Sequence, residues 1–375
     1  MGMESECAKM QPTEKITGTQ LGFLIFTFIV STIILTIPGW MVMFAKQNAW
    51  LSLIPSTTTG LVTLWVFITL SKRYPGLSII QYSSKILGKW LGRCLGLYYV
   101  YFWYDSISVM VIQHTFFIKT LLLPKSPTFV GSMTLLVLCG IAVYLGIEVI
   151  GRANEFLTPM ILVSLIPILI LAILEADPVL LKPFLGEGIL PVLQGAVIPA
   201  GAFMTQMFIL GWLLPYLNQP KVALKVSMIA YSGISVFIFL IVLLSIMILG
   251  TLTGKLTYSV LSVMQYIGIE GSFERLEAIA VAMWVLGNFV KVSVSLFILC
   301  LSVSQVLEIR NYRDIVAPLT ILSIIGSIWI FKNAAELQIH LAFVYPVGGF
   351  ITQTLIPLAL LIIDTIKRKA VHSLP

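Results

Sequence analysis

Residues 16–45 read ITGTQLGFLIFTFIVSTIILTIPGWMVMFA, and no side chain in this stretch carries a charge. A bilayer core about 30 Å thick needs about 20 mostly apolar residues for each helix that crosses it, so the stretch is long enough to span a membrane. Uncharged runs of similar length recur along the chain and predict an all-α integral membrane protein with several spans. These further runs cover 47–71, 126–147, 188–220 and 226–254.

The composition agrees with a membrane protein. Of the 375 residues, 58% are hydrophobic and only 10% are charged, whereas a soluble domain carries about 25% charged residues. The net charge of +7 does not indicate nucleic acid binding, because the basic residues lie mainly in short loops between apolar segments. The cysteines are far apart, so we expect no disulfide framework, no metal site and no cofactor. They are Cys7, Cys94, Cys139 and Cys300.

We predict ten spans within a single transmembrane transporter-fold domain at residues 16–365. A polar cytoplasmic tail at 1–15 precedes this domain, and a cytoplasmic tail at 366–375 follows it. Two repeats of five spans each cover about 20–174 and 193–364. The spans are 20–44, 49–71, 93–118, 128–147, 155–174, 193–217, 224–250, 276–306, 314–331 and 339–364.

The orientation follows from the Lys and Arg residues of the loops, which are in excess on the cytoplasmic side of membrane proteins. An even number of spans puts both termini on one side of the membrane, and fifteen basic residues lie on that side against seven on the other. Lys291 lies within a span and belongs to neither side. We therefore expect both termini in the cytoplasm.

Helix-breaking residues interrupt the first and sixth spans. Pro removes a backbone donor and Gly loosens a helix, and unwound backbone at membrane depth is tolerated only where it is buried in protein or lines a cavity. Paired breaks in two inverted repeats indicate a central site suited to a carboxylate, with simple kinking as the alternative. The residues are Ser31, Thr32, Thr36, Pro38 and Gly39 in span one, and Gly195, Pro199, Ala200, Gly201, Gly211 and Pro215 in span six.

Two charged residues lie inside predicted spans. Asp105 is near the middle of span three, and Lys291 is near the middle of span eight. A charge at the bilayer centre costs roughly 2.5–3.5 kcal/mol, so each side chain is expected to face the protein interior and to have a partner. One interpretation is an ion or substrate site. The other is a structural salt bridge between Asp105 and Lys291, or a contact of Lys291 with backbone carbonyls.

No group of residues predicts an enzyme. An intramembrane aspartyl protease needs two facing carboxylates, and the remaining aspartates, Asp177, Asp314 and Asp364, lie in loops or at a span end. The three histidines are isolated, which gives no metal-ligand spacing, and no phosphate-binding loop is present.

Short strings in and beside the predicted spans carry a family resemblance. AKQNAWLS at 45–52 follows span one, and RYP at 73–75 is followed by ILGKWLG at 86–92. GIE at 146–148 precedes span five. The most specific string is FERLE at 273–277, which precedes span eight and its FVK at Lys291.

Taken in order from about residue 16 to residue 365, these strings resemble the spore germination receptor B-subunit family, a branch of the amino acid–polyamine–organocation transporters. The resemblance implies a LeuT-like fold with five-plus-five inverted repeats and broken spans one and six. It also implies a nutrient sensor in the inner membrane of a bacterial spore, acting with an A subunit and a lipoprotein C subunit. Three positions depart from the family pattern: Val30 and Lys46 replace Gly, and Gln206 replaces Glu.

Three functions are consistent with these residues. The first is a sensor that binds an amino acid or similar small nutrient, with Lys291 as a fixed cation where related transporters hold sodium. The second is a proton-coupled amino acid permease with Asp105 as the proton carrier, and the third is an ion-conducting pore subunit. The expected ligand-binding residues are Ser31, Thr32 and Ile33 through their backbone, Tyr101 and Asp105 in span three, Ala200, Gly201 and Phe203 in span six, and Ser293 and Phe297 in span eight.

Overall fold

The computed structural model describes residues 14–267 and 276–372, and helices make up most of this part of the chain. Most of the predicted tail at 1–15 lies outside the described residues, as do the end of the tail at 366–375 and the first three residues of the FERLE string. The predicted all-α fold is confirmed for the described chain.

Each of the ten predicted spans coincides with a helix or with a series of helical segments. Spans one to five are α2 (Gly18–Ala45), α3 (Leu53–Arg73), α5 (Lys89–Leu121), α6 (Thr128–Leu145) and α7 (Ile147–Leu174). Span six begins with α8 (Leu190–Ala202), and spans seven to nine are α10 (Ala223–Leu249), α12 (Leu276–Val306) and α13 (Val316–Trp329). Span ten contains α14 (Ala334–Ile339), α15 (Tyr345–Phe350) and α16 (Ile356–His372). The helices α4 (Ile79–Leu87) and α11 (Ser259–Ile267) lie between spans.

The length and hydropathy of these helices support a polytopic membrane protein. Among the described residues, nine helical segments are long and apolar enough to cross a membrane. One of these nine segments, Thr36–Arg73, contains the C-terminal part of α2 and all of α3. The first half of α2, Gly18–Ile33, is a shorter apolar helix.

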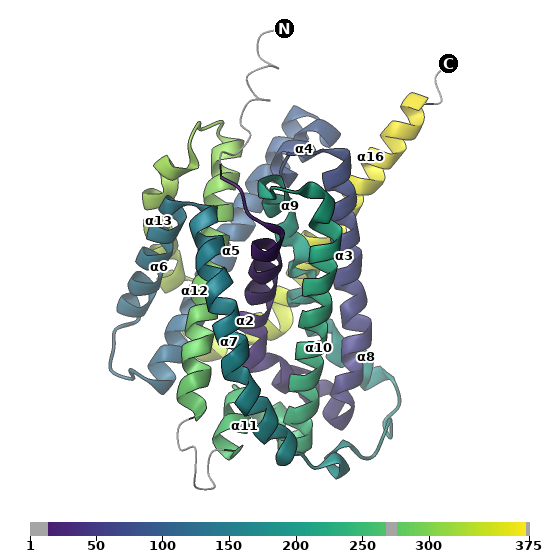
Figure 1. Ribbon diagram of the computed structural model, residues 1–375, viewed down its shortest axis with the longest axis vertical. Coiled ribbons are helices and arrows are strands. Elements are labelled where there is room, and N and C mark those ends of the chain that lie inside the picture. Colours follow the sequence, from purple (N-terminus) through teal and green to yellow (C-terminus); the bar gives the residue numbers. More distant parts are fainter. Residues whose placement is uncertain (1–13, 268–275, 373–375) are drawn as a thin grey trace.

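Helix α2 lies at the centre of the bundle, where it packs against α7, α8, α10 and α12 (Figure 1). The described chain begins at Glu14 near the end of the molecule to which the C-terminal end of α16 also runs (Figure 1). An even number of spans places both ends of the chain on the same side of the membrane, which agrees with this arrangement.

The first span differs from the prediction, because α2 is helical throughout, from Gly18 to Ala45. The Ser31 hydroxyl lies 3.4 Å from the Phe28 carbonyl of its own helix, so this polar side chain does not unwind the backbone. The disturbance is local and lies one to two turns later, beside Pro38. There the Gly39 N–H donates to Ser259 Oγ at 3.1 Å. The expected break at Ser31 and Thr32 is therefore wrong.

The sixth span is broken, as predicted. Helix α8 ends at Ala202, and Phe203 has φ −128° and ψ −50°, outside the usual helical values. The chain continues as a 3-10 helix, Met204–Ile209, then as α9 (Leu210–Leu213) and a further 3-10 turn. All residues of Met204–Ile209 are buried, which is the setting in which irregular backbone is tolerated at membrane depth.

Span ten packs directly against this break through two glycines. A Cβ atom on Gly201 would collide with the carbonyl oxygen of Pro346 in α15. A Cβ atom on Gly349 would lie 2.5 Å from the carbonyl oxygen of Gly201. The backbones of α8 and α15 therefore touch, which only residues without a side chain allow.

One carboxylate joins several helix ends on the side of the termini. Glu14 Oε2 accepts the N–H of Ile147 at 2.8 Å, at the start of α7. Glu14 Oε1 accepts the Tyr312 hydroxyl at 2.9 Å and Arg313 Nη2 at 2.6 Å, just before α13. The neighbouring Ile16 pairs with the chain after span six, since its N–H donates to the Tyr216 carbonyl at 2.9 Å. Spans one, five, six and nine are thus linked at this end.

A second buried carboxylate joins spans two and ten. Asp364 Oδ2 accepts Arg73 Nη1 at 2.7 Å, and Asp364 Oδ1 accepts the Tyr74 hydroxyl at 2.5 Å. Partial burial and the hydrogen bond to Asp364 both raise the pKa of Tyr74. Arg368, one turn further along α16, also donates to Asp364 at 3.0 Å.

We expect Gly201→Ala to destabilise the fold, because the added methyl group meets backbone that cannot move aside. Overpacking of this kind costs about 1–3 kcal/mol. The measurement is the thermal unfolding temperature of the purified chain in detergent, followed by tryptophan fluorescence. Gly233→Ala is the matched control, since a Cβ atom there meets nothing within 4 Å. Equal melting temperatures for the two variants would contradict the close contact between α8 and α15.

We also expect Glu14→Gln to lower the unfolding temperature. The change removes the charge that Arg313 pairs with, and hydrogen bonds to charged groups contribute about 1.5–3 kcal/mol each. Glu308→Gln is the control, because the Arg93–Glu308 pair is exposed and exposed pairs contribute about 0–1 kcal/mol. If both variants unfold at the same temperature, Glu14 does not hold these helix ends together.

Candidate functional site

The site centres on Lys291, whose side chain is buried with 2% exposure in the middle of α12. Its Nζ atom donates to Thr32 Oγ1 at 2.6 Å and to Gln206 Oε1 at 2.8 Å. The same atom lies 4.7 Å from the centre of the Phe28 ring, close enough for a cation–π interaction. One ammonium group therefore joins spans one, six and eight.

Gln206 connects this ammonium group to the break in span six. Its Nε2 atom donates to the Ala202 carbonyl at 2.7 Å, while its Oε1 atom accepts from Lys291. Ala202 is the last residue of α8, so its carbonyl is one of those that a helix end leaves without an intrahelical partner. The side chain thus satisfies a free carbonyl on one side and a buried cation on the other.

Hydroxyl groups satisfy further carbonyls at the break. The Thr59 hydroxyl of α3 lies 3.0 Å from the Ala200 carbonyl and 2.8 Å from the Ser56 carbonyl of its own helix, and its single proton is available to either. The Thr205 hydroxyl lies 2.9 Å from the Gly201 carbonyl and 3.1 Å from Gln353 Oε1. A buried polar group without a partner is costly, and these side chains remove that cost. The broken helix is therefore held by spans two and ten as well as by Lys291.

A small cavity adjoins Lys291 and Gln206. Its volume is about 10 Å³, which leaves room for about one water molecule. Sites for small ligands occupy about 300–1,000 Å³, so the site is closed, and an amino acid would enter it only after the helices move apart. The lining residues are Phe28, Phe102, Trp103, Ser106, Met110, Gln206, Phe208, Ile209, Lys291, Tyr345 and Gln353.

The salt bridge between Asp105 and Lys291, one of the two interpretations of these charges, is absent from the described ion pairs. Lys291 instead contacts neutral oxygen atoms. Asp105 is half-buried and interacts electrostatically with His340 at the start of the π-helical part of span ten. No ion pair of Asp105 is found in residues 14–267 and 276–372. The two intramembrane charges therefore do not neutralise each other directly.

Tyr101 does not belong to the site, because its side chain is 64% exposed on the outer surface of α5. Tyr99 and Trp103, four residues apart, occupy the buried face of the helix. Successive helical residues are 100° apart, so a residue midway between these two points to the opposite side. The expectation that Tyr101 faces the ligand is wrong for this reason.

The other predicted residues are buried but only partly gathered. Thr32 contacts Lys291, and Phe203 lies at the break with its ring 6.5 Å from that of Trp40. The backbone N–H groups of Ser31, Thr32 and Ile33 lie inside the continuous α2, so the helix itself uses them. The side chains of Ser31 and Ile33 are buried.

Two predicted residues of span eight point away from Lys291. Ser293 is two residues further along α12 and therefore lies on another face of the helix. Phe297 is about 9 Å along the helix axis from Lys291, and its ring lies 5.3 Å from Tyr216 and 5.2 Å from Tyr312, close to Glu14. Neither residue lines the central cavity.

Sequence reasoning missed the contribution of span ten and the role of Gln206. Gln206 was expected in the presumed pocket, as a departure from a family pattern, and along the water path of a pore, but not as the link between Lys291 and α8 that its amide forms. Tyr345 and Gln353 line the cavity from span ten, beside π-helical stretches that often occur at functional sites. The polar run Thr352-Gln353-Thr354 inside an apolar helix was the available signal.

Solved transporter structures share this fold. A Na⁺-coupled sialic acid symporter in a substrate-bound outward-open state aligns with a TM-score of 0.67 at 12% identity, covering 94% of this chain and 90% of that one. A nucleobase-cation-symport-1 family transporter with bromovinylhydantoin bound aligns with a TM-score of 0.64 at 13% identity, covering 88% of this chain and 75% of that one. MhsT in complex with L-phenylalanine aligns with a TM-score of 0.59 at 14% identity, covering 93% of this chain and 97% of that one. These matches confirm the LeuT-like transporter fold.

Curated relatives agree with the resemblance seen in the sequence. Spore germination protein KB of Bacillus subtilis (strain 168) is 29% identical over 95% of this chain and 96% of its own length. Spore germination protein YndE of the same strain is 25% identical over 79% and 82%. The sequence pattern of a family described as "Spore germination protein" matches residues 15–335, which is most of the chain. The chain belongs to this family of permease-like spore germination membrane proteins.

Proposed function

We propose that this protein is the nutrient-sensing membrane subunit of a spore germinant receptor. In this proposal it binds an amino acid or similar small nutrient at mid-membrane and signals to A and C subunits to trigger germination. The family supports the role in germination. The observation that carries the proposal is the Lys291 ammonium group, buried at the junction of spans one, six and eight beside a closed cavity.

The nutrient carboxylate would bind Lys291. A carboxylate carries a full negative charge and the Gln206 amide oxygen is neutral, so a carboxylate would attract the ammonium group more strongly and displace Gln206 Oε1. The aromatic rings of Phe28, Trp103 and Phe208 would pack against an apolar part of the nutrient, and Gln353 would offer a polar contact. The cavity lining thus favours an amino acid with an apolar side chain.

Signalling would follow from the release of Gln206. Its amide holds the Ala202 carbonyl only while its own position is fixed by Lys291. The break would then have two states, one with Gln206 bound to Lys291 and one with Gln206 released. A ligand that binds Lys291 favours the released state, and such a difference in affinity shifts a conformational equilibrium. Because Lys291 already supplies a cation at this place, the shift would need no sodium ion.

The proposed orientation puts both termini, and the Glu14 contacts, on the cytoplasmic side of the inner spore membrane. The excess of basic residues in the loops on that side supports this arrangement. The partner subunits would then receive the signal from helix ends that Glu14 links together.

A proton-coupled amino acid permease is the second candidate, and Asp105 is the observation that favours it. A half-buried carboxylate at membrane depth with no ion pair in the described chain has the properties of a proton carrier. The transporter fold permits either function, since a fold does not determine one.

We expect Lys291→Met to abolish the nutrient response and to leave the protein folded. Met has a similar length and is apolar, so the side chain keeps its shape, and we expect only a lower unfolding temperature because Gln206 Oε1 loses its donor. The measurement is a thermal-shift screen of the purified wild-type chain against amino acids and common sugars, repeated on the variant with every hit. Lys332→Met, at an exposed position, is the control. A variant that keeps the wild-type shift would show that Lys291 does not bind the nutrient.

We further expect no concentrative uptake of that nutrient by the purified chain in proteoliposomes under an inward proton gradient. A sensor needs binding and a conformational change, whereas a permease needs net transport. Uptake of radiolabelled nutrient distinguishes the two. Concentrative uptake that Asp105→Asn abolishes would instead establish the permease.

A further inference from the structure

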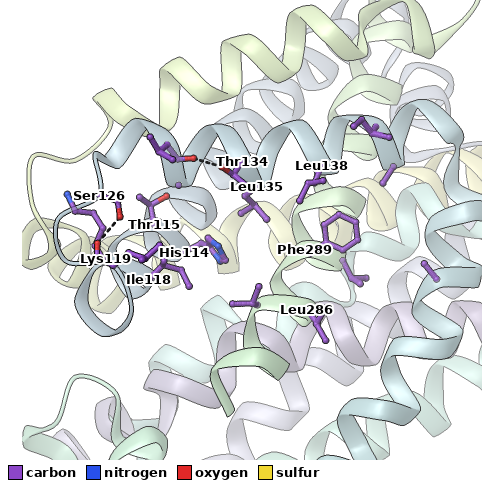
Figure 2. A pocket seen from close by; sticks show the side chains of 18 of the residues that line it. His114, Thr115, Ile118, Lys119, Ser126, Thr134, Leu135, Leu138, Leu286 and Phe289 are labelled. Carbon is purple, nitrogen blue, oxygen red and sulfur yellow. Dashed lines mark hydrogen bonds between the residues drawn. The ribbon is translucent and has the colours of Figure 1, made fainter. Parts of the chain in front are cut away.

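A large cavity lies away from Lys291, on the outside of the bundle. It is a groove of about 660 Å³ bordered by α5, α6, α7 and α12. Figure 2 shows Leu135, Leu138, Leu286 and Phe289 along it, with His114, Lys119 and Ser126 grouped toward one end. It extends along α6 from Pro127 to Leu145, a length of about 25 Å at the rise of a helix.

The groove is open to the surroundings of the protein. Leu138, Ile141 and Leu145 of α6 line it and are more than half exposed, and Val149 at the start of α7 is 40% exposed. Exposed apolar side chains on membrane-spanning helices face the acyl chains of the bilayer. The occupant of this groove therefore comes from the membrane side.

One end of the groove is cationic. Lys119 is the single charged side chain among the lining residues, and no acidic residue is among them. Its Nζ atom donates to Thr128 Oγ1 at 3.0 Å, which holds the ammonium group at the start of α6. A Lys side chain has three donors, and the described chain provides a partner for one of them. Lys125 lies in the loop between α5 and α6 and is exposed.

We propose that this groove is a binding site for a phospholipid with an anionic headgroup. The acyl chain lies along Leu138 and Ile141, and the phosphate of the headgroup pairs with Lys119. Cationic pockets between membrane helices are suited to anionic headgroups. The site is separate from the nutrient site and does not depend on the proposed function.

The groove is too small to enclose a helix from a partner subunit or a second copy of the chain, which could only lie across its opening. A helix with its side chains is about 10–12 Å wide, so a length of 25 Å occupies on the order of 2,000 Å³. That is about three times the volume of the groove. A single acyl chain is much narrower, and its charged end accounts for the position of Lys119.

The charge of the headgroup decides which phospholipid the groove prefers. The acyl chain contributes little to this preference, because its surroundings are apolar both in the bilayer and in the groove. One Lys near the membrane surface favours an anionic lipid about fivefold. The experiment uses the purified full-length chain, loaded with phosphatidylglycerol or phosphatidylcholine of identical acyl chains and analysed by native mass spectrometry. We expect the wild-type chain to retain phosphatidylglycerol about fivefold better.

Two pairs of variants separate charge from shape. Lys119→Gln is expected to reduce phosphatidylglycerol retention to the level of phosphatidylcholine, whereas Lys332→Gln, at an exposed position, keeps the preference. Leu138→Trp is expected to fill the groove and reduce the retention of both lipids, whereas Ile321→Trp, on the exposed face of α13, leaves retention unchanged. None of the four positions is buried, and an unfolding temperature equal to that of the wild-type chain is the check that each variant is folded.

Three outcomes would overturn the proposal. The first is equal retention of the two lipids by the wild-type chain. The second is equal loss in Lys119→Gln and Lys332→Gln. The third is a dimer of the chain in lipid nanodiscs that Leu138→Trp abolishes, because the groove would then belong to an interface between proteins.

Discussion

The fold depends on how a buried ammonium group at membrane depth is satisfied. Lys291 pairs with no carboxylate of the described residues, and its contacts are the Thr32 hydroxyl, the Gln206 amide oxygen and the Phe28 ring. A charge in this position is costly unless its donors are used. Thr32 and Phe28 lie in span one and Gln206 lies in span six, whereas Lys291 lies in span eight. The contacts of one side chain therefore fix the relative positions of these three spans.

The same requirement accounts for the irregular backbone of span six. A broken helix leaves carbonyl groups without partners, and at this depth no bulk water replaces them. Gln206, Thr205 and Thr59 supply the missing donors. Because Gln206 also accepts from Lys291, the cation and the helix break stabilise each other, and a ligand that changes one changes the other.

The sequence alone predicted the spans and both intramembrane charges, because hydropathy and charge are local properties. It did not predict which face of a helix is buried. Tyr101 and Asp105 were expected to face a ligand, but the buried face of α5 carries Tyr99 and Trp103. A mostly apolar helix has no polar face in its sequence from which the buried face could be recognised. The break expected at Ser31 was also wrong, because a hydroxyl that bonds within its own helix leaves the helix intact.

The glycine contact between α8 and α15 has a mechanical consequence. Where side chains separate two helices, small rotamer changes absorb a displacement, and the neighbour does not have to follow. At Gly201 and Gly349 the peptide planes themselves meet, so this junction has almost no compliance. We therefore expect a displacement of the end of α8 to move α15 with it, because no side chain separates the two backbones.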